Sequence, residues 1–136
     1  MQPESFAGFI VKSSPIHGRG LFAARLFQQG EVVLHWTNAK ELSNEEYENL
    51  PESERPYVDI NHGKIFLMGK PERFVNHSCN ANTTTGDKCD IAVKDINEGE
   101  EITADYAECI AIGQRMTCSC GSSGCQGTIV GRQKVG

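Results

Sequence analysis

The amino-acid sequence predicts a mainly β protein with short helices, and three observations support this. Short apolar runs recur along the chain, and most of them are bounded by Gly, Asn or Pro. Only one stretch carries a clear helix start signal. With 136 residues, 38% of them hydrophobic, the chain is long enough for one ordinary core and too short for two comfortable ones. One structural unit is therefore expected.

Seven strands are predicted from runs rich in Val, Ile, Phe and Thr, which favour an extended, half-buried backbone. These runs cover residues 6–12, 20–25, 31–36, 57–61, 64–68, 90–94 and 100–104. The segment "INHGK" separates the fourth run from the fifth and contains Gly63. A hairpin is expected there, with His62 as a solvated turn residue.

One short helix is predicted to begin at Ser43. The motif "SNEE" places this hydroxyl three residues before Glu46, which is the arrangement of a capping box. Pro51, or the residues just after it, should end the helix, because proline removes a backbone donor and clashes with the preceding turn.

The charge and the first residues limit the partners and the compartment. A net charge of -5 disfavours a general nucleic-acid binder and favours a basic partner. The opening stretch "MQPESFAGFIVKSS" lacks the basic and apolar regions of a secretory signal, and no run of about eighteen apolar residues could span a membrane. We expect an intracellular protein, in the cytoplasm or the nucleus, whose six cysteines are thiols or metal ligands.

Three cysteines stand close together near the end of the sequence, in "TCSCGSSGC". Cys118, Cys120 and Cys125 have the spacing C-x-C-x4-C among Gly and Ser. A disulfide needs two thiols and a structural zinc normally needs four ligands, so a fourth ligand is expected elsewhere. Cys79, in a polar loop rich in Asn, is the predicted fourth ligand, and His77 is the alternative.

The two remaining cysteines stand in apolar surroundings. Cys89 opens the run "CDIAVK", and Cys109 lies in "AECIAIG". A thiol in such a run usually packs as a small buried hydrophobic group, and this is the prediction for both.

Four motifs occur in a characteristic order. They are "GRGLFA" (18–23), "RFVNHSCNAN" (73–82), "EEITADY" (100–106) and "CSCGSSGC" (118–125). Together they resemble the SET-domain protein lysine methyltransferases over nearly the whole chain. The resemblance implies a SET domain over residues 1–112 and a cysteine-rich post-SET tail over 113–136. It also implies a knot-like crossing of the carboxyl-terminal segment beside the NHSC strand.

The resemblance implies one zinc ion. In SET domains with such a tail, the cysteine of the NHSC motif joins the three tail cysteines. Here these are Cys79, Cys118, Cys120 and Cys125. Four thiolates leave no open position for water, so the zinc would be structural and would pin the tail to the NHSC loop.

The resemblance also implies a cofactor, S-adenosylmethionine, and a lysine amine as methyl acceptor. It places Tyr106 where the two meet, with a hydroxyl able to orient the amine. Arg19 would meet the carboxylate of the cofactor's methionine portion, and Asn76 with His77 would contact the adenosine. The complete set of implied cofactor-binding residues is His17, Gly18, Arg19, Gly20, Tyr57, Arg73, Phe74, Asn76 and His77.

The substrate channel departs from the family pattern at Ala104. The family usually carries Phe or Tyr two residues before the tyrosine, and that ring limits how many methyl groups the channel admits. Loss of the ring would open the channel, so we expect weak restriction of the methylation state, with di- or trimethyl-lysine as product. The alternatives are that other side chains refill the space, or that the open site has lost efficient catalysis. The substrate would be a lysine-bearing protein or peptide such as a histone, with no direct contact to nucleic acid or membrane.

A second reading is a non-catalytic, zinc-stabilised module that binds a peptide. The retention of Tyr106, Asn76, His77 and the "GRG" turn favours the enzyme, because a pure binder has no evident need of them all. A zinc-ribbon nucleic-acid binder fits poorly, because paired C-x2-C knuckles are missing and the charge has the wrong sign.

Overall fold

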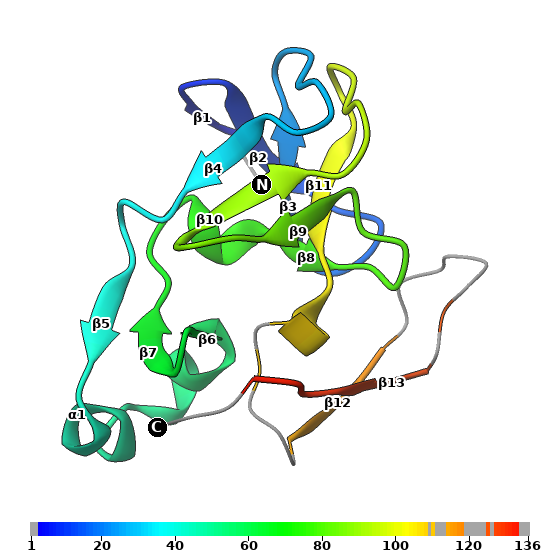
Figure 1. Cartoon of the computed structure of the whole chain (residues 1–136). Coiled ribbons are helices and arrows are strands. Elements are labelled where there is room, and N and C mark those ends of the chain that lie inside the picture. The colour runs from blue at the N-terminus through cyan, green and yellow to red at the C-terminus, as the bar shows by residue number, and fades with distance from the viewer. Residues whose placement is uncertain (1–2, 109, 111–113, 119–124, 126, 134–136) are drawn as a thin grey trace.

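The computed structural model describes residues 3–108, 110, 114–118, 125 and 127–133, and strands dominate it (Figure 1). The strands are β1 (Glu4–Phe6), β2 (Phe9–Ser13), β3 (Arg19–Ala23), β4 (Val32–His35), β5 (Lys40–Leu42), β6 (Val58–Asn61), β7 (Lys64–Leu67), β8 (Asn76–His77), β9 (Thr83–Thr85), β10 (Cys89–Ala92), β11 (Glu101–Ala104), β12 (Arg115–Thr117) and β13 (Thr128–Val130). The helices are α1 (Asn44–Glu48) and the 3-10 helices η1 (Glu52–Tyr57), η2 (Glu72–Phe74) and η3 (Tyr106–Glu108). The predicted mainly β fold with short helices is confirmed. Within the described ranges, no helix is long and apolar enough to cross a membrane.

The largest sheet has the strand order β1-β2-β3-β11-β8. Strand β11 is antiparallel to β3, with Ile102 opposite Leu21, and parallel to β8, with Thr103 opposite Asn76. The NHSC strand therefore lies directly beside the carboxyl-terminal strand, and the next backbone bond runs from the Ser78 N–H to the Ala104 carbonyl at 3.1 Å. This pairing brings the two motifs with predicted site residues together.

Asn82 holds the loop after β8 against β11. Its side-chain amide donates to the Glu101 carbonyl at 2.8 Å, and its carbonyl oxygen accepts from the Thr103 N–H at 2.9 Å. One buried side chain thus satisfies two backbone groups of β11, which would be costly to leave unpaired.

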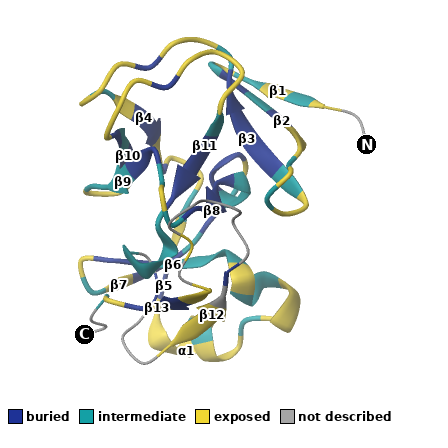
Figure 2. Cartoon of the chain, turned by 90° about the vertical axis from the view of Figure 1, so that its right-hand side faces the viewer, coloured by how far each residue is buried: buried dark blue, intermediate teal, exposed yellow. Residues whose placement is uncertain are grey.

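Three smaller sheets complete the fold (Figure 1). Strands β4, β10 and β9 pair in that order, and β5, β7 and β6 form a sheet near α1. Strands β12 and β13 pair as an antiparallel ladder below η3. Figure 2 shows that β3, β8 and β11 are largely buried, whereas α1 and β12 are largely exposed.

The main core lies between the five-stranded sheet and the β4-β10-β9 sheet. Val11, Leu21 and Ile102 are fully buried in it, and the rings of Phe9 and Phe27 stack with centroids 5.6 Å apart. Each large apolar side chain buried in this way stabilises the fold by about 1.5–3 kcal/mol. A separate, small cluster of Ile110, Cys118 and Ile129 packs the tail against Tyr106.

The strand predictions hold with one correction. The predicted strand 6–12 is wrong as a single strand, because Gly8 adopts φ +84° and turns the chain into the β1–β2 hairpin, with Phe6 opposite Phe9. The other six predicted runs each overlap an observed strand. The strands without a prediction, β5, β8, β9, β12 and β13, have two or three residues each and carry little sequence signal.

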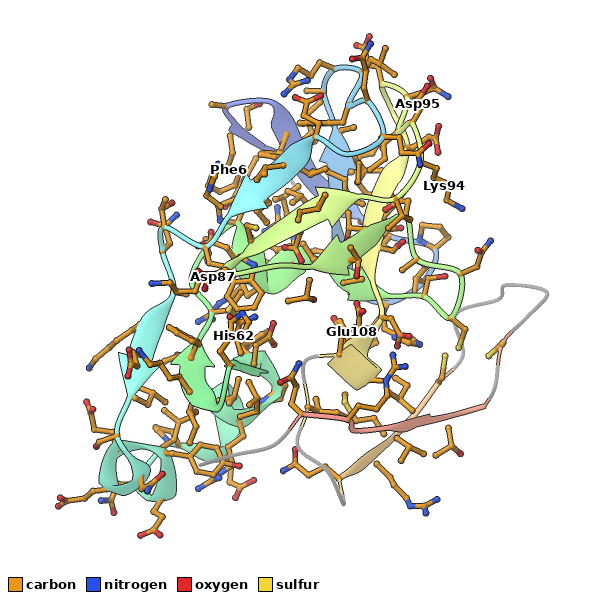
Figure 3. The ribbon with its side chains drawn as sticks, in the orientation of Figure 1. Phe6, His62, Asp87, Lys94, Asp95 and Glu108 are labelled. Atoms are coloured by element: carbon orange, nitrogen blue, oxygen red, sulfur yellow. The ribbon has the colours of Figure 1, made fainter. Side chains whose placement is uncertain are left out.

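The predicted helix start and hairpin are confirmed. The Glu46 N–H donates to the Ser43 hydroxyl at 3.1 Å, and the Ser43 N–H donates to the Glu46 carboxylate at 3.0 Å. Helix α1 ends at Glu48, earlier than expected. The β6–β7 turn puts His62 at φ 50°, exposed, with its ring 3.9 Å from the Asp87 carboxylate, and Figure 3 shows the two side chains near each other.

Candidate functional site

Tyr106 lies where strand β11 leads into η3, and contacts with two residues, Val75 and His77, fix its position. Its hydroxyl donates to the Val75 carbonyl at 2.6 Å, and its backbone N–H donates to Nδ1 of His77 at 3.0 Å. Its ring centroid is 5.3 Å from that of His77. Because the hydroxyl proton is directed at Val75, the lone pairs of the oxygen remain able to accept a hydrogen bond from an amine.

A narrow cavity adjoins Tyr106. It holds about 40 Å³ of free volume, and its lining includes Tyr57, Arg73, Ala104 and Tyr106. The Arg73 guanidinium lies 4.2 Å from the centre of the Tyr57 ring. The structure therefore brings four of the predicted site residues to one cavity, and apolar groups such as Val75 complete its wall.

Two buried acids line the same cavity, and the sequence interpretation did not single them out. Glu72 is 3% exposed and accepts hydrogen bonds from the Asn38 N–H at 2.6 Å and from its side-chain amide at 3.2 Å. Asp90 is 4% exposed and accepts one from the Trp36 indole N–H at 3.0 Å. A signal for Asp90 was present, because a single acid inside the apolar run "CDIAVK" must point either to solvent or into a polar site.

Burial raises the pKa of Asp90 from 3.8 to about 7. The hydrogen bond from Trp36 opposes this rise, whereas the negative charges of Glu108 and Glu72 add to it. A carboxyl group with this pKa changes its protonation state in the neutral range, unlike an ordinary aspartic acid.

The "HGRG" segment and the NHSC strand meet beside β3. The Ser14 N–H donates to the Gly18 carbonyl, closing a turn in which Gly18 adopts φ 41°. The Asn76 side-chain amide donates to the carbonyls of His17 and Arg19, at 3.0 Å each. The Arg19 guanidinium lies 5.5 Å from the centre of the Phe74 ring. These residues form one cluster. Tyr57 and Arg73 do not belong to it and line the cavity instead.

Gly20 is held against Glu101 in this cluster. The Glu101 carboxylate accepts hydrogen bonds from the Ser14 hydroxyl at 2.8 Å and from the Asn76 amide at 3.0 Å. A Cβ on Gly20 would clash with the Glu101 carboxylate and lie 2.9 Å from its Cδ. The glycine is therefore needed for close packing against a carboxylate that two groups of the cluster, Ser14 and Asn76, share.

Replacing Gly20 by Ala is expected to lower the free energy of unfolding by about 1–3 kcal/mol, because Glu101 must move and give up hydrogen bonds to make room. Chemical denaturation followed by circular dichroism measures this. Glu101→Ala should relieve the clash, so the double variant should lose less than the sum of the two single losses. Simple additivity would contradict this account of the glycine.

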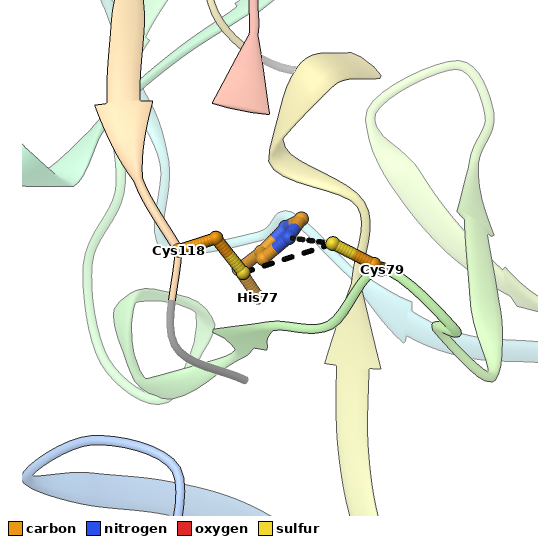
Figure 4. A group of neighbouring side chains, drawn as sticks. All are labelled: His77, Cys79 and Cys118. Atoms are coloured by element: carbon orange, nitrogen blue, oxygen red, sulfur yellow. Dashed lines mark hydrogen bonds between the residues drawn. The ribbon is translucent and has the colours of Figure 1, made fainter. Parts of the chain in front are cut away.

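Three potential metal ligands meet between the NHSC strand and the tail (Figure 4). A ring nitrogen of His77 and the sulfurs of Cys79 and Cys118 all lie within 4.8 Å of one another. The Cys118 sulfur is 3.7 Å from that of Cys79 and 3.6 Å from that of Cys125. Cys120 lies outside the described residues.

The spacing of these sulfurs suits a tetrahedral metal ion. A zinc ion with Zn–S bonds of about 2.3 Å places two thiolate sulfurs about 3.8 Å apart. Both observed separations are close to this value, and thiolate ligands are those that a structural zinc prefers. The described donors therefore fit zinc in chemistry and in spacing.

The remaining cysteines divide between the described and undescribed parts of the chain. Cys89 is buried, as predicted, and its burial raises the pKa of the thiol. A neutral thiol in such a place packs as a small apolar group. Cys109 lies outside the described residues.

Comparison with known proteins connects this geometry to a family. Residues 18–107 match the SET domain. The histone H3-lysine(4) N-trimethyltransferase ATX1 of Arabidopsis thaliana is 29% identical over 134 residues, covering 85% of this chain and 12% of that protein. The histone-lysine N-methyltransferase trithorax of Drosophila virilis is 30% identical over 145 residues, covering 90% of this chain and 4% of that protein. The chain thus spans a small part of the length of these relatives.

The solved structures agree on the fold. The methyltransferase domain of the human histone-lysine N-methyltransferase SETMAR superposes with a TM-score of 0.68 at 21% identity, covering 89% of this chain and 57% of that one. The arrangement of strands is therefore that of a SET methyltransferase domain. With the match over residues 18–107, the chain belongs to the SET-domain family, whose methyltransferases use S-adenosylmethionine.

Proposed function

We propose that this chain is an S-adenosylmethionine-dependent protein-lysine methyltransferase that acts on a histone or another basic protein. The observation that carries the proposal is the narrow cavity beside Tyr106, whose hydroxyl is fixed by the Val75 carbonyl. A narrow channel suits an unbranched lysine side chain, and the fixed hydroxyl suits orientation of its amine.

Methyl transfer from S-adenosylmethionine to lysine requires that the two reactants be positioned, and it needs no nucleophilic side chain of the protein. When bound, S-adenosylmethionine supplies an activated methyl group on its sulfonium. The protein must exclude water, hold the amine in line and favour its uncharged form, because free lysine has a pKa of about 10.4. The apolar part of the cavity wall lowers the pKa of a lysine that enters, and Tyr106 accepts a hydrogen bond from its amine.

We assign the cofactor to the cluster around the "HGRG" segment. Arg19 would bind the carboxylate of the methionine portion, and the backbone of Asn76 and His77 would contact the adenosine. The hydrogen bonds from the Asn76 amide to the carbonyls of His17 and Arg19 support this assignment, because they hold the turn against the NHSC strand. Gly18, Gly20 and Phe74 shape the same cluster, and Tyr57 and Arg73 would contact the cofactor from the cavity side.

The substrate peptide would reach the cavity along a groove between η1 and β12. Pro56, Val58, Ile110 and Met116 line both the cavity and this groove, so the two adjoin. Such a groove can hold the peptide backbone while a lysine extends into the cavity. The net charge of -5 favours a basic peptide.

We also propose a division of the chain into a SET domain, residues 1–112, and a post-SET tail, residues 113–136. One structural zinc ion would join them, with Cys79, Cys118, Cys120 and Cys125 as its ligands. The hydrogen bond of His77 supports this choice over His77 as a ligand. Nδ1 accepts the Tyr106 N–H, so it carries no proton, and the neutral ring then has its proton on Nε2. That N–H points at the Cys79 sulfur, 3.4 Å away, as a donor to a thiolate.

Ala104 provides a test of the methylation state. We expect the wild type to form di- or trimethyl-lysine, and Ala104→Tyr to stop at monomethyl-lysine, because a ring beside Tyr106 would fill the space that a methylated amine needs. Mass spectrometry of a histone substrate after exhaustive reaction measures this. A wild type that forms only monomethyl-lysine would refute the open channel. Because Ala104 is buried, the thermal stability of the variant must be measured alongside.

The test of the function is transfer of a labelled methyl group from S-adenosylmethionine to core histones and to whole-cell protein. Methyl-lysine in the digested product supports the enzyme. The alternative is a non-catalytic peptide-binding module with the same zinc-stabilised shell. A folded, zinc-loaded chain that transfers no methyl group to any protein would favour this alternative.

A further inference from the structure

Asp90 is a buried acid in the wall of the proposed lysine channel. It lies on β10, and the same cavity is lined by Ala104 and Tyr106. Only 4% of its surface is exposed. Burying a carboxylate is costly unless it is paired, so a fold that keeps one there needs a reason.

The surroundings of Asp90 offset little of the free-energy cost of burying its carboxylate. One described neighbour donates a hydrogen bond to it, the Trp36 indole N–H, and the charges that act on it are the negative ones of Glu108 and Glu72. The Glu108 carboxylate itself accepts from the Thr84 hydroxyl at 3.0 Å, at the β9 side of η3 (Figure 3). Asp90 is therefore a carboxylate in a negatively charged environment.

Two more charged residues, Asp59 and Arg73, line the cavity. The Arg73 guanidinium donates to the Met68 carbonyl at 2.9 Å and 3.1 Å and lies 3.4 Å from the Glu54 carboxylate. The Arg73 cation in the cavity wall is thus already paired with the Met68 carbonyl and the Glu54 carboxylate. With three acids and one engaged arginine in its lining, the cavity attracts a positive charge.

We propose that Asp90 is the general base that removes the proton from the substrate lysine before methyl transfer. This inference rests on the proposed function. The lysine enters as an ammonium ion, attracted by the acidic wall. One Nζ–H bond breaks, and the proton forms an O–H bond with the Asp90 carboxylate. The freed lone pair of Nζ then forms the N–C bond while the C–S bond of the sulfonium breaks and its electron pair stays on sulfur. The Asp90 proton passes to solvent when the peptide leaves.

The burial of Asp90 gives it the right basicity for this step. An ordinary aspartate, with a pKa near 3.9, is a poor acceptor of a proton from an ammonium ion of pKa near 10.4. A pKa of about 7 removes much of this mismatch. Glu72 is less suited, because the two hydrogen bonds from Asn38 already occupy its carboxylate.

The experiment measures kcat/KM for methyl transfer to core histones between pH 6 and 9.5. The kcat/KM of the wild type should rise with pH and level off above about pH 7. Asp90→Asn keeps the shape of the side chain and an oxygen for Trp36, but it cannot take the proton. We expect its rate to fall about 10²-fold at pH 7 and to approach that of the wild type as the pH nears the pKa of free lysine. Asp87→Asn is the matched control, since Asp87 has a side chain 80% exposed, and it should keep the wild-type profile.

A stability measurement supplies a readout that does not need activity. Asp90 holds its proton in the folded protein up to about pH 7, whereas the unfolded chain releases it near pH 3.8. The stability that Asp90 contributes is therefore complete below pH 3.8 and is lost as the pH rises to about 7. Asp90→Asn should melt at a higher temperature than the wild type at pH 8 and at a similar temperature at pH 4. Equal melting temperatures at both pH values would contradict the buried ionisation.

The remaining outcomes separate this inference from the function. If the wild type is active and Asp90→Asn has the same rate and pH profile, Asp90 is not the base and the methyltransferase stands. If Glu72→Gln, and not Asp90→Asn, changes the pH profile, the base is Glu72 and the assignment to Asp90 is wrong. If the wild type transfers no methyl group to any protein, the proposed function fails, and this inference fails with it.

Discussion

Replacing Tyr106 by Phe should lower kcat for methyl transfer by about 10²–10³-fold. The variant keeps the ring, which packs beside His77 and on the cluster of Ile110 and Ile129. It loses the hydroxyl, which donates to the Val75 carbonyl and leaves its oxygen available to the amine. A labelled-methyl assay on core histones measures the effect, in the same preparation that is tested for zinc and for S-adenosylmethionine binding.

The controls for Tyr106→Phe separate chemistry from folding. Loss of one partly exposed hydrogen bond should lower the free energy of unfolding by only about 1 kcal/mol. Zinc content and cofactor affinity should stay close to those of the wild type. A variant that retains the wild-type rate would show that Tyr106 does not orient the amine.

Replacing Cys79 by Ser should reduce the zinc content from about one ion per chain to near none, because a hydroxyl is a poor ligand where a thiolate is required. Cofactor affinity and methyl transfer should fall together, since His77 binds both to the Cys79 sulfur and to the Tyr106 N–H. The tail should also become sensitive to trypsin at Arg115 and Arg132. Elemental analysis, calorimetric titration and limited proteolysis measure the three effects.

Cys89→Ser is the matched control for this variant. Cys89 is a buried thiol outside the cluster, so its replacement should lower stability and leave zinc content unchanged. Zinc content that survives in Cys79→Ser, or that is lost equally in Cys89→Ser, would refute the assignment of Cys79 as a ligand.

The sequence predicts the longer strands because, over four or more residues, they either alternate between apolar and polar side chains or are continuously apolar. Strands such as β3 and β11 fill the main core, and their pattern is imposed by burial. Strands β8 and β9 have two and three residues, and tertiary bonds to β11 hold them. No local pattern can reveal such elements, because the residues that stabilise them lie far away in the chain.

The candidate site is only partly visible in the sequence. Motifs predict Tyr106 and four thiols as site residues, and among the described residues the structure brings Cys79, Cys118 and Cys125 together. The same motifs predict Arg73 as a cofactor residue, and its guanidinium lies on the ring of Tyr57, another residue of that predicted set. Asp90 belongs to no motif. Its burial becomes evident only in the folded structure, where β10 pairs with β4 and the Trp36 indole N–H donates to its carboxylate.

The position of β11 has a consequence for synthesis on the ribosome. Strands β1, β2 and β3 follow one another in the chain and can pair as soon as they emerge. Strand β8 cannot join them, because β11 lies between it and β3. Until residues 101–104 leave the ribosome, β3 and β8 each have an unpaired edge, and closing so long a loop is slow. A nascent chain paused before Glu101 thus exposes strand edges that neighbouring chains can pair with.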